Sequence, residues 1–176
     1  DAGSEAVTQI VANTRLPTEK ANGYQTMKTA EALAWIASPV VLWVPTRFRP
    51  AGFLGARDPF VYYGVERRFR LRLLPSLDLV TPLARTLPRW LGKCVFLPQA
   101  LSFSLAACVA AALSRDRVWY SRDVYFFYLF APLARLFGKK VHLEAHHALP
   151  RLGGWRRLAL ASAAGVVAIT RGLADD

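Results

Sequence analysis

Residues 7–37, VTQIVANTRLPTEKANGYQTMKTAEALAWIA, decide the fold that the sequence predicts. The apolar run 7–12 is typical of a buried β-strand, and the polar loop 13–22 follows it. A helix is predicted over about residues 23–37, because apolar side chains recur there at helical spacing. Strand, loop and helix in this order form the first unit of an α/β fold.

The same alternation continues along the rest of the chain. Apolar runs rich in β-branched and aromatic residues predict strands at 40–44, 68–74, 118–121, 141–145 and 165–169. Helical spacing predicts helices at 83–91, 99–113, 123–137 and 155–161. Apolar strands that alternate with helices form a parallel sheet covered on both faces. The predicted fold class is therefore α/β, with a Rossmann-like, doubly wound parallel sheet in a single domain.

Composition limits the kind of protein. The chain has 176 residues, 53% of them hydrophobic, and a formal net charge of +11. The hydrophobic content excludes a disordered polypeptide, and the length suits one domain. The positive charge indicates a polyanionic partner, which could be nucleic acid, anionic lipid or a phosphorylated substrate. Cys94 and Cys108 do not form a disulfide framework, so we expect a reducing, cytoplasmic location.

Residues 94–114 carry no charge, over about the length that spans a bilayer. Pro98, Gln99 and several serines interrupt the apolar character, and the alanines of this segment suit close packing. We expect a core helix beside the sheet rather than a membrane span.

Four of the predicted strands end in polar residues. The strand ends carry Asn13, Thr14 and Arg15; Ser121, Arg122 and Asp123; Glu144, His146 and His147; and Thr170 and Arg171. Ligands of an open parallel sheet bind beyond the carboxyl ends of its strands. These residues therefore predict one rim that holds a polar, oxygen-rich ligand.

Gly23, at the start of the first predicted helix, allows two interpretations. A glycine there lets the backbone approach a ligand, and the free N–H groups of the first turn favour an anion. Alternatively, Gly23 serves only as a helix cap. The sequence contains neither a GxGxxG fingerprint nor a Walker A motif, which argues against a nucleotide-dependent oxidoreductase.

The segment 142–147, HLEAHH, invites a metal hypothesis. His142 and His146 share one face of a strand, but at 3.3 Å per residue they lie about 13 Å apart, too far to share one ion. No metal site is predicted. A histidine at a strand end could instead donate a hydrogen bond or carry a proton for a ligand, or be satisfied inside the core.

Basic residues concentrate between positions 47 and 72, interleaved with aromatic ones. The predicted membrane or polyanion surface consists of Arg47, Arg49, Arg67, Arg68, Arg70 and Arg72. Such a surface could hold nucleic acid through phosphates and stacking, lie on an anionic membrane, or be a solvated face without function.

Five segments together resemble a known family. They are VANTRLPTEKANGYQ (11–25), KTAEALA (28–34), VWYSRD (118–123), GKKVHLEAH (138–146) and VVAITRGL (166–173). Their order and spacing are similar to the N-terminal domain of GT-B glycosyltransferases of family 4 (glycosyl transferase group 1). VWYSRD resembles the family's Y-[ST]-R-[DN] segment, and Glu144-Ala145-His146 its E-x-H.

The resemblance implies a retaining enzyme that moves a sugar from a nucleotide-sugar donor to an acceptor, with this domain chiefly binding the acceptor. It implies a catalytic role for His146 near the reacting centre. The substrate-binding residues that it implies are Asn22, Gly23, Tyr24, Arg122, Glu144 and Thr170.

The resemblance also carries expectations about the whole protein. We expect residues 1–4 to be a remnant of processing or cloning, residues 5–176 to form the acceptor-side domain, and the C-terminal donor-binding domain to be absent. On that expectation the chain binds no cofactor alone and is inactive without its C-terminal domain or a donor subunit. The other expected partners are a glycan or lipid-linked acceptor and an anionic membrane surface on which the protein is peripheral. Nucleic acid is the less favoured partner, and the alternative function is a non-catalytic module that holds nucleic acid or anionic lipid.

Overall fold

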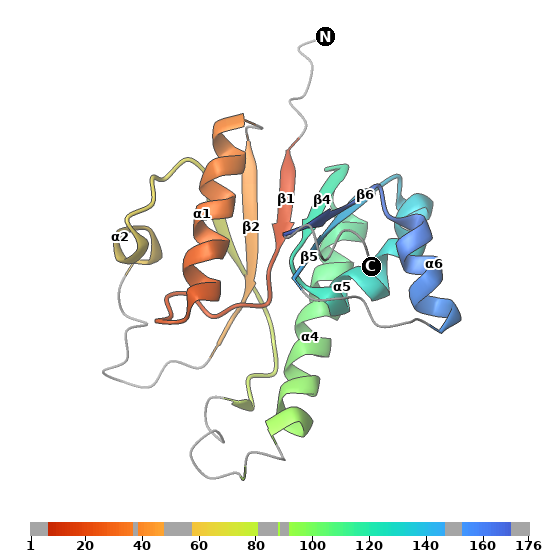
Figure 1. Ribbon diagram of the computed structural model, residues 1–176, viewed down its shortest axis with the longest axis horizontal. Helices are drawn as coiled ribbons and strands as arrows, with labels where there is room; N and C mark the ends of the chain where they lie inside the picture. The colour runs from red at the N-terminus through yellow and green to blue at the C-terminus, as the bar shows by residue number, and fades with distance from the viewer. Residues whose placement is uncertain are drawn as a thin grey trace.

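The computed structural model describes residues 7–36, 39–47, 58–80, 88, 92–146 and 153–169 of the chain. Within these residues the centre of the molecule is a six-stranded, all-parallel sheet in the order β3-β2-β1-β4-β5-β6 (Figure 1). The strands are β1 (Thr8–Val11), β2 (Val40–Pro45), β3 (Arg70–Leu74), β4 (Val118–Ser121), β5 (Lys140–Ala145) and β6 (Gly165–Ala168). All six predicted strands are confirmed, with ends that differ by at most two residues.

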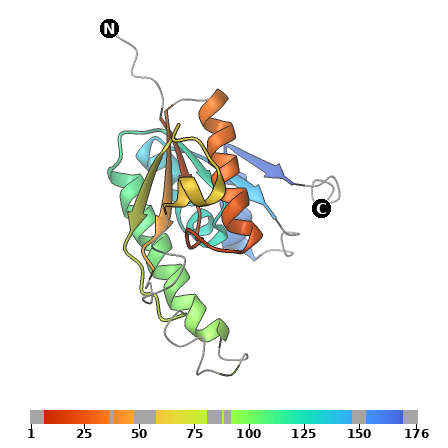
Figure 2. The ribbon, with the colours of Figure 1, turned by 90° about the vertical axis from the view of Figure 1, so that its left-hand side faces the viewer.

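Helices cover both faces of the sheet. Their bounds are α1 (Ala21–Ile36), α2 (Pro59–Tyr63), α4 (Gly92–Leu113), α5 (Val124–Phe130), the 3₁₀ helix η3 (Ala131–Phe137) and α6 (Gly154–Ser162). Helices α1 and α2 lie on one face, and α4 lies on the other with α5, η3 and α6 (Figure 2). The predicted Rossmann-like α/β class is thereby confirmed.

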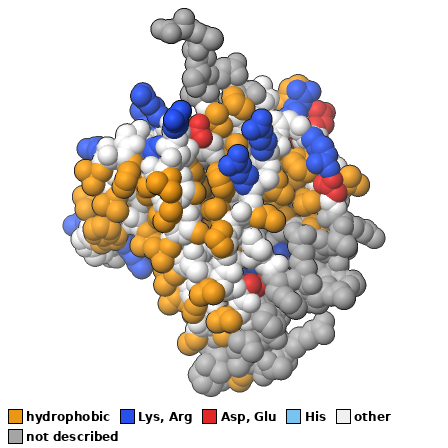
Figure 3. Space-filling model, turned by 180° about the vertical axis from the view of Figure 1, so that it is seen from behind, with side chains coloured by type: hydrophobic (Ala, Val, Ile, Leu, Met, Phe, Trp, Pro, Cys, Tyr) orange, Lys and Arg blue, Asp and Glu red, His pale blue; other side chains and the backbone are white. Residues whose placement is uncertain are grey.

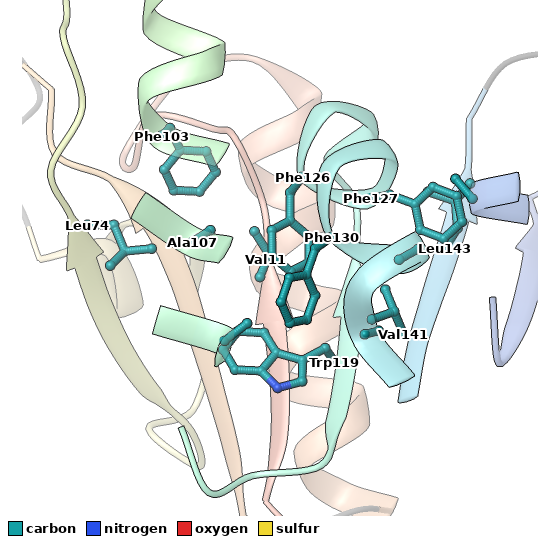
Figure 4. Close-up of a cluster of buried hydrophobic side chains, with 14 residues drawn as sticks. Val11, Leu74, Phe103, Ala107, Trp119, Phe126, Phe127, Phe130, Val141 and Leu143 are labelled. Carbon is teal, nitrogen blue, oxygen red and sulfur yellow. The ribbon is translucent and has the colours of Figure 1, made fainter. Parts of the chain in front are cut away.

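Each face has its own core. On the α4 side, Trp119, Phe126 and Phe130 meet Val11 between the sheet and the helices (Figure 4). The Phe126 and Phe130 rings stack with their centroids 5.4 Å apart. On the α1 side a second cluster joins Met27 and the strands to α2. Burial on both faces explains why β2 is wholly apolar, whereas the edge strand β3 carries exposed Arg70 and Arg72.

The order of the strands places the crevice of the fold. β1 pairs with β2 on one side and with β4 on the other, so the chain changes direction across the sheet between β1 and β4. Ligands of doubly wound sheets bind outside the carboxyl ends of the strands at this point. The ends of β1, β4 and β5 therefore frame the region in which a site is expected.

Two of the predicted helices have different bounds in the structure. Helix α4 starts at Gly92, seven residues before the prediction, and runs through Pro98. A proline removes one intrahelical hydrogen bond, and here both Pro98 and Cys94 are exposed, so water can satisfy the freed carbonyl. The helix predicted over 123–137 divides into α5 and η3 at Pro132, which has no N–H to continue the α-helical pattern.

Two further differences concern helices α2 and α4. Helix α2 was not predicted, although Asp58 caps it, Pro59 begins it and Gly64 ends it with a left-handed backbone, φ 58°. The expected core helix α4 has only one side in the core. The helix predicted at 83–91 lies outside the described residues.

Candidate functional site

A cleft of about 950 Å³ opens at the carboxyl ends of β1, β4, β5 and β6. Its polar side is formed by Asn13, Asn22, Arg122, Asp123, Glu144 and His146. Its apolar side comes from α4, α5 and α6, with Phe96, Leu101, Tyr125, Tyr128, Leu129 and Trp155. The cleft therefore offers charged and hydrogen-bonding groups along one wall and aromatic and aliphatic surface along the other.

An ionic cluster of Arg122, Glu144 and His146 lies on the polar side. The Glu144 Oε1 atom lies 3.0 Å from Arg122 Nε and 2.7 Å from His146 Nε2. The Arg122 and Glu144 side chains are only 4% and 7% exposed, whereas that of His146 is 26% exposed. The buried pair therefore forms a base from which the imidazole reaches the cleft.

Two groups lie beside the Nε2 atom of His146, one an acceptor and one a donor. Glu144 Oε1 can only accept a hydrogen bond, and at 2.7 Å it is closer than Arg122 NH2 at 3.1 Å. With a proton on Nε2 the imidazole donates a hydrogen bond to Glu144, and without one it accepts a hydrogen bond from Arg122. A carboxylate that holds the imidazole in this way fixes the orientation of the ring toward a ligand.

Tyr120 and Thr26 complete the cluster, and neither was predicted. The Tyr120 hydroxyl donates to Glu144 Oε2 at 2.7 Å, and Arg122 NH1 donates to Thr26 Oγ1 at 2.9 Å. Burial, with the Glu144 contact second, raises the pKa of Tyr120, so the phenol stays protonated and remains a donor. Tyr120 stands in the VWYSRD segment, which was a usable signal. No sequence motif marks Thr26 as a site residue, because only the tertiary packing brings helix α1 close to Arg122 at the end of β4.

Asp123 binds α5 to α4 at the floor of the cleft. Its Oδ1 atom accepts from the Phe126 N–H at 2.6 Å and from the Ser104 hydroxyl at 2.9 Å. Burial raises the pKa of the Asp123 carboxyl, and these hydrogen bonds act in the opposite direction. Asp123 is thus a structural cap of α5 that also faces the cleft.

Arg47 has a different place from the one predicted. Its NH2 group donates to Asn13 Oδ1 and to Gln99 Oε1, both at 3.0 Å, and NH1 lies 3.9 Å from Asp78 Oδ1. Its side chain is only 11% exposed. Because amide and carboxylate acceptors from β1, α4 and the loop after β3 surround it, the guanidinium is held inside the molecule and not on a polyanion surface. Gln99, wholly buried in this cluster, was not predicted as a site residue.

The predicted basic surface is divided between the two faces of the sheet. Arg68 lies over the Trp35 ring of α1, and Arg67 pairs with Asp58 at the start of α2. Arg72 lies instead over Trp43, which packs into the core on the α4 side. Arg67 and Arg68 precede β3 and lie with α1 and α2, whereas Arg70 and Arg72 are two residues apart on β3 itself, where alternate side chains point to one face. Arg70 and Arg72 therefore share a face that Arg67 and Arg68 do not, and Arg49 lies outside the described residues.

Of the residues predicted in the first helix, the cleft is lined by Asn22. Gly23 is buried instead against Tyr63 and Thr18: an added Cβ would lie 2.5 Å from Thr18 Cγ2 and closer still to the Tyr63 hydroxyl. The Tyr24 ring lies beside Tyr63, with centroids 6.4 Å apart. Packing within the protein is thus sufficient reason for a glycine at this position. Thr170 lies outside the described residues.

The site residues do not form a metal centre within the described part of the chain, where no three His, Cys, Asp or Glu side chains lie close enough to hold an ion. His142 lies away from the cleft, with its ring against Gly165 of β6. Burial, and the charge of Lys140, lower the pKa of His142, which favours the neutral imidazole.

The fold of this chain has likenesses among solved structures. No protein-family model matches the sequence, and no curated protein matches it. Among solved structures, apo UGT2 of Phytolacca americana is similar, with 16% sequence identity and a TM-score of 0.48. The likeness covers 80% of this chain and 29% of that chain, so this chain spans less than a third of that protein. The fold class is established by the parallel pairing and order of the six strands.

Proposed function

We propose that this chain is the acceptor-binding domain of a retaining glycosyltransferase that uses a nucleotide-sugar donor. The observation that carries the proposal is the cluster of Arg122, Glu144 and His146 at the carboxyl ends of β4 and β5, within the cleft. Arg122 belongs to the VWYSRD segment, and Glu144 and His146 form the E-x-H; both segments resemble glycosyltransferases of family 4. Donor binding and completion of the catalytic site are assigned to a C-terminal domain or a separate subunit.

The cleft has the chemistry that a glycoside requires. Sugars present hydroxyl groups that both donate and accept, and apolar ring faces that pack on aromatic side chains. His146, partly exposed and oriented by Glu144, supplies a hydrogen-bonding group at the polar wall. Trp155 and Tyr128 supply aromatic surface opposite, and Arg156 lies over the Tyr128 ring with its guanidinium carbon 5.5 Å from the centroid.

In this proposal the buried Arg122–Glu144 pair positions His146, and His146 contacts the substrate. Most of the pair is buried and out of reach of a ligand, but it orients the imidazole through the 2.7 Å contact between Glu144 Oε1 and His146 Nε2. Positioning of reacting groups and electrostatic stabilisation of a departing nucleotide diphosphate supply most of the catalysis in such a reaction. We assign the second of these to the donor-binding domain.

Glycan binding by the purified chain tests the proposal. Saturation-transfer NMR and calorimetry against a panel of glycosides and glycolipids should detect binding, and His146→Ala should weaken it by roughly 3–10-fold, the effect of one lost hydrogen bond. His142→Ala is the matched control, because His142 lies on β5, the strand that His146 directly follows, but does not line the cleft. Absence of glycan binding, or equal losses for both variants, would overturn the assignment.

The expected dependence on a donor domain has its own test. The chain alone should transfer no radiolabelled sugar from nucleotide sugars to the glycan that it binds, whereas the chain joined to its donor-binding partner should. Transfer by the chain alone would show that the division of labour proposed here is wrong.

A further inference from the structure

Helix α4 has an exposed apolar ridge along its outer side. The ridge consists of Leu97, Leu101, Leu105, Val109 and Leu113, each four residues from the next. Side chains spaced by four form one continuous row that turns gradually round a helix, and an advance of sixteen residues at 1.5 Å each carries it about 24 Å along the axis. Leu105 and Val109 are each 57% exposed and Leu113 is 81% exposed. The ridge is therefore a linear hydrophobic surface that faces solvent.

The opposite side of α4 is already buried. Phe103, Ala107 and Ala111 pack into the core beneath the sheet, and they are wholly inaccessible. The segment Cys94–Leu113 has a mean hydropathy of 1.8 and is long and apolar enough to cross a membrane by length and composition. One side of it, however, is fixed to the sheet. What the helix leaves for a partner is the outer ridge.

Positive charge lies on the same face as the ridge. Exposed Arg115 and Arg117 directly follow Leu113, and Arg70 and Arg72 are exposed on the α4 side of β3. Figure 3 shows this face, with hydrophobic side chains over much of it and Lys and Arg gathered mainly in its upper part.

Among the described residues, acidic groups offset this charge only in part, since Asp116 lies between Arg115 and Arg117. Asp58, Glu31 and Glu66 lie on the α1 side and form ion pairs there. Asp116, beside α4, accepts hydrogen bonds from Gln9 and Ser114. An apolar row bordered by cations is complementary to an anionic bilayer surface, where headgroups meet the cations and acyl chains meet the row.

We propose that the α4 ridge docks the protein on an anionic membrane, with the helix lying in the plane of the interface. The net charge of +11 opposes a second copy as the occupant, because two such faces would repel each other. The surface differs from the arginine stretch 47–72 that the sequence indicated. Leu101 belongs both to the ridge and to the lining of the cleft, so the cleft opens beside the docked surface. A lipid-linked ligand could enter there without leaving the bilayer.

Vesicle binding tests the docking without any sugar, so its failure is separate from failure of the proposed function. Purified protein is sedimented with vesicles of phosphatidylcholine alone, and with vesicles of equal phosphatidylcholine and phosphatidylglycerol. We expect binding to the anionic vesicles only. Leu105→Gln/Val109→Gln should weaken it by at least about 10-fold, since each fully inserted aliphatic side chain contributes roughly that factor.

Two further variants separate the ridge from the general properties of the chain. Ile36→Gln/Val61→Gln removes strongly exposed aliphatic side chains from the α1 side and should bind like the wild type. Arg115→Gln/Arg117→Gln should weaken binding by roughly fivefold for each charge. Circular dichroism checks that every variant is folded.

Several results would overturn the proposal. They are absence of binding by the wild type, equal binding by the Leu105→Gln/Val109→Gln variant, and an equal loss in the α1-side variant. A wild-type dimer in sedimentation velocity that the ridge variant abolishes would also overturn it, because the occupant would then be a second copy.

Discussion

Replacing Gly23 by alanine should destabilise the protein through a contact that has no connection with ligand binding. The added Cβ would lie 2.5 Å from Thr18 Cγ2, about 1 Å inside the normal separation of two carbon atoms, and closer still to the Tyr63 hydroxyl. That hydroxyl cannot move freely, because it accepts from the Thr18 N–H at 2.6 Å and donates to the Thr18 carbonyl at 2.8 Å.

The net effect is a difference between two terms. Overpacking a buried contact costs about 1–3 kcal/mol, and alanine regains about 0.5–1 kcal/mol over glycine inside a helix. We therefore expect Gly23→Ala to lower the free energy of unfolding by about 1–2 kcal/mol. For a chain of this size that corresponds to a fall in Tm of roughly 2–8 °C.

A double-mutant cycle with Tyr63→Phe identifies the cause. The phenylalanine removes the oxygen that the new Cβ would meet, so Gly23→Ala should cost about 1 kcal/mol less in that background. Urea unfolding of the four proteins measures the coupling. Equal losses in both backgrounds would refute the argument. So would a Gly23→Ala protein of normal stability that has lost glycan affinity, since glycine would then serve the ligand.

Three further predictions concern the site and the cysteines. Glu144→Gln leaves the buried Arg122 without its counter-charge and should lower the free energy of unfolding in urea by about 3–5 kcal/mol. The pKa of Asp123 is raised in the folded state, so between the unfolded-state and folded-state pKa the folded protein binds more protons than the unfolded one. The free energy of unfolding should therefore fall as pH rises through this interval. Asp123→Asn should remove this dependence in urea unfolding measured between acid and neutral pH. Cys94 is exposed, whereas burial raises the pKa of Cys108 to about 12, so a thiol reagent at pH 8 should modify Cys94 first and Cys94→Ser should abolish the fast phase.

The sequence was sufficient to predict the strands and to place polar residues where the cleft opens. The apolar runs of the central strands are buried on both faces of the sheet, which leaves a strong pattern. Polar residues follow the strands where their parallel ends meet. Arg122, Glu144 and His146 were predicted on this ground, and the structure brings them within hydrogen-bond or ion-pair distance. Their partner Tyr120 lies in the VWYSRD segment and had a usable signal, but Thr26 could not be selected in the same way, because its contact with Arg122 depends on how α1 packs against the end of β4.

The arginine stretch shows the limit of such patterns. Clustering in sequence suggested one surface, but Arg68 and Arg72 lie on opposite sides of the sheet, and Arg47 is enclosed by Asn13 and Gln99. Arg68 precedes β3 and lies against α1, whereas Arg72 belongs to β3 and lies over Trp43. The approach of α4 to the ends of β1 and β2 encloses Arg47.

By itself, the sequence determined the parallel α/β fold and the polar rim, because burial on both faces and strand ends at one edge are properties of the order of residues along the chain. Only the tertiary structure decided which groups meet. In the structure, Tyr63 packs so close to Gly23 that a side chain does not fit there, and Arg47 is buried. One side of α4 enters the core, and its outer row of apolar side chains is exposed. The physical reason is that each of these depends on which segment packs against which, and helix α4 has no charge between Cys94 and Leu113 to show which side faces the sheet.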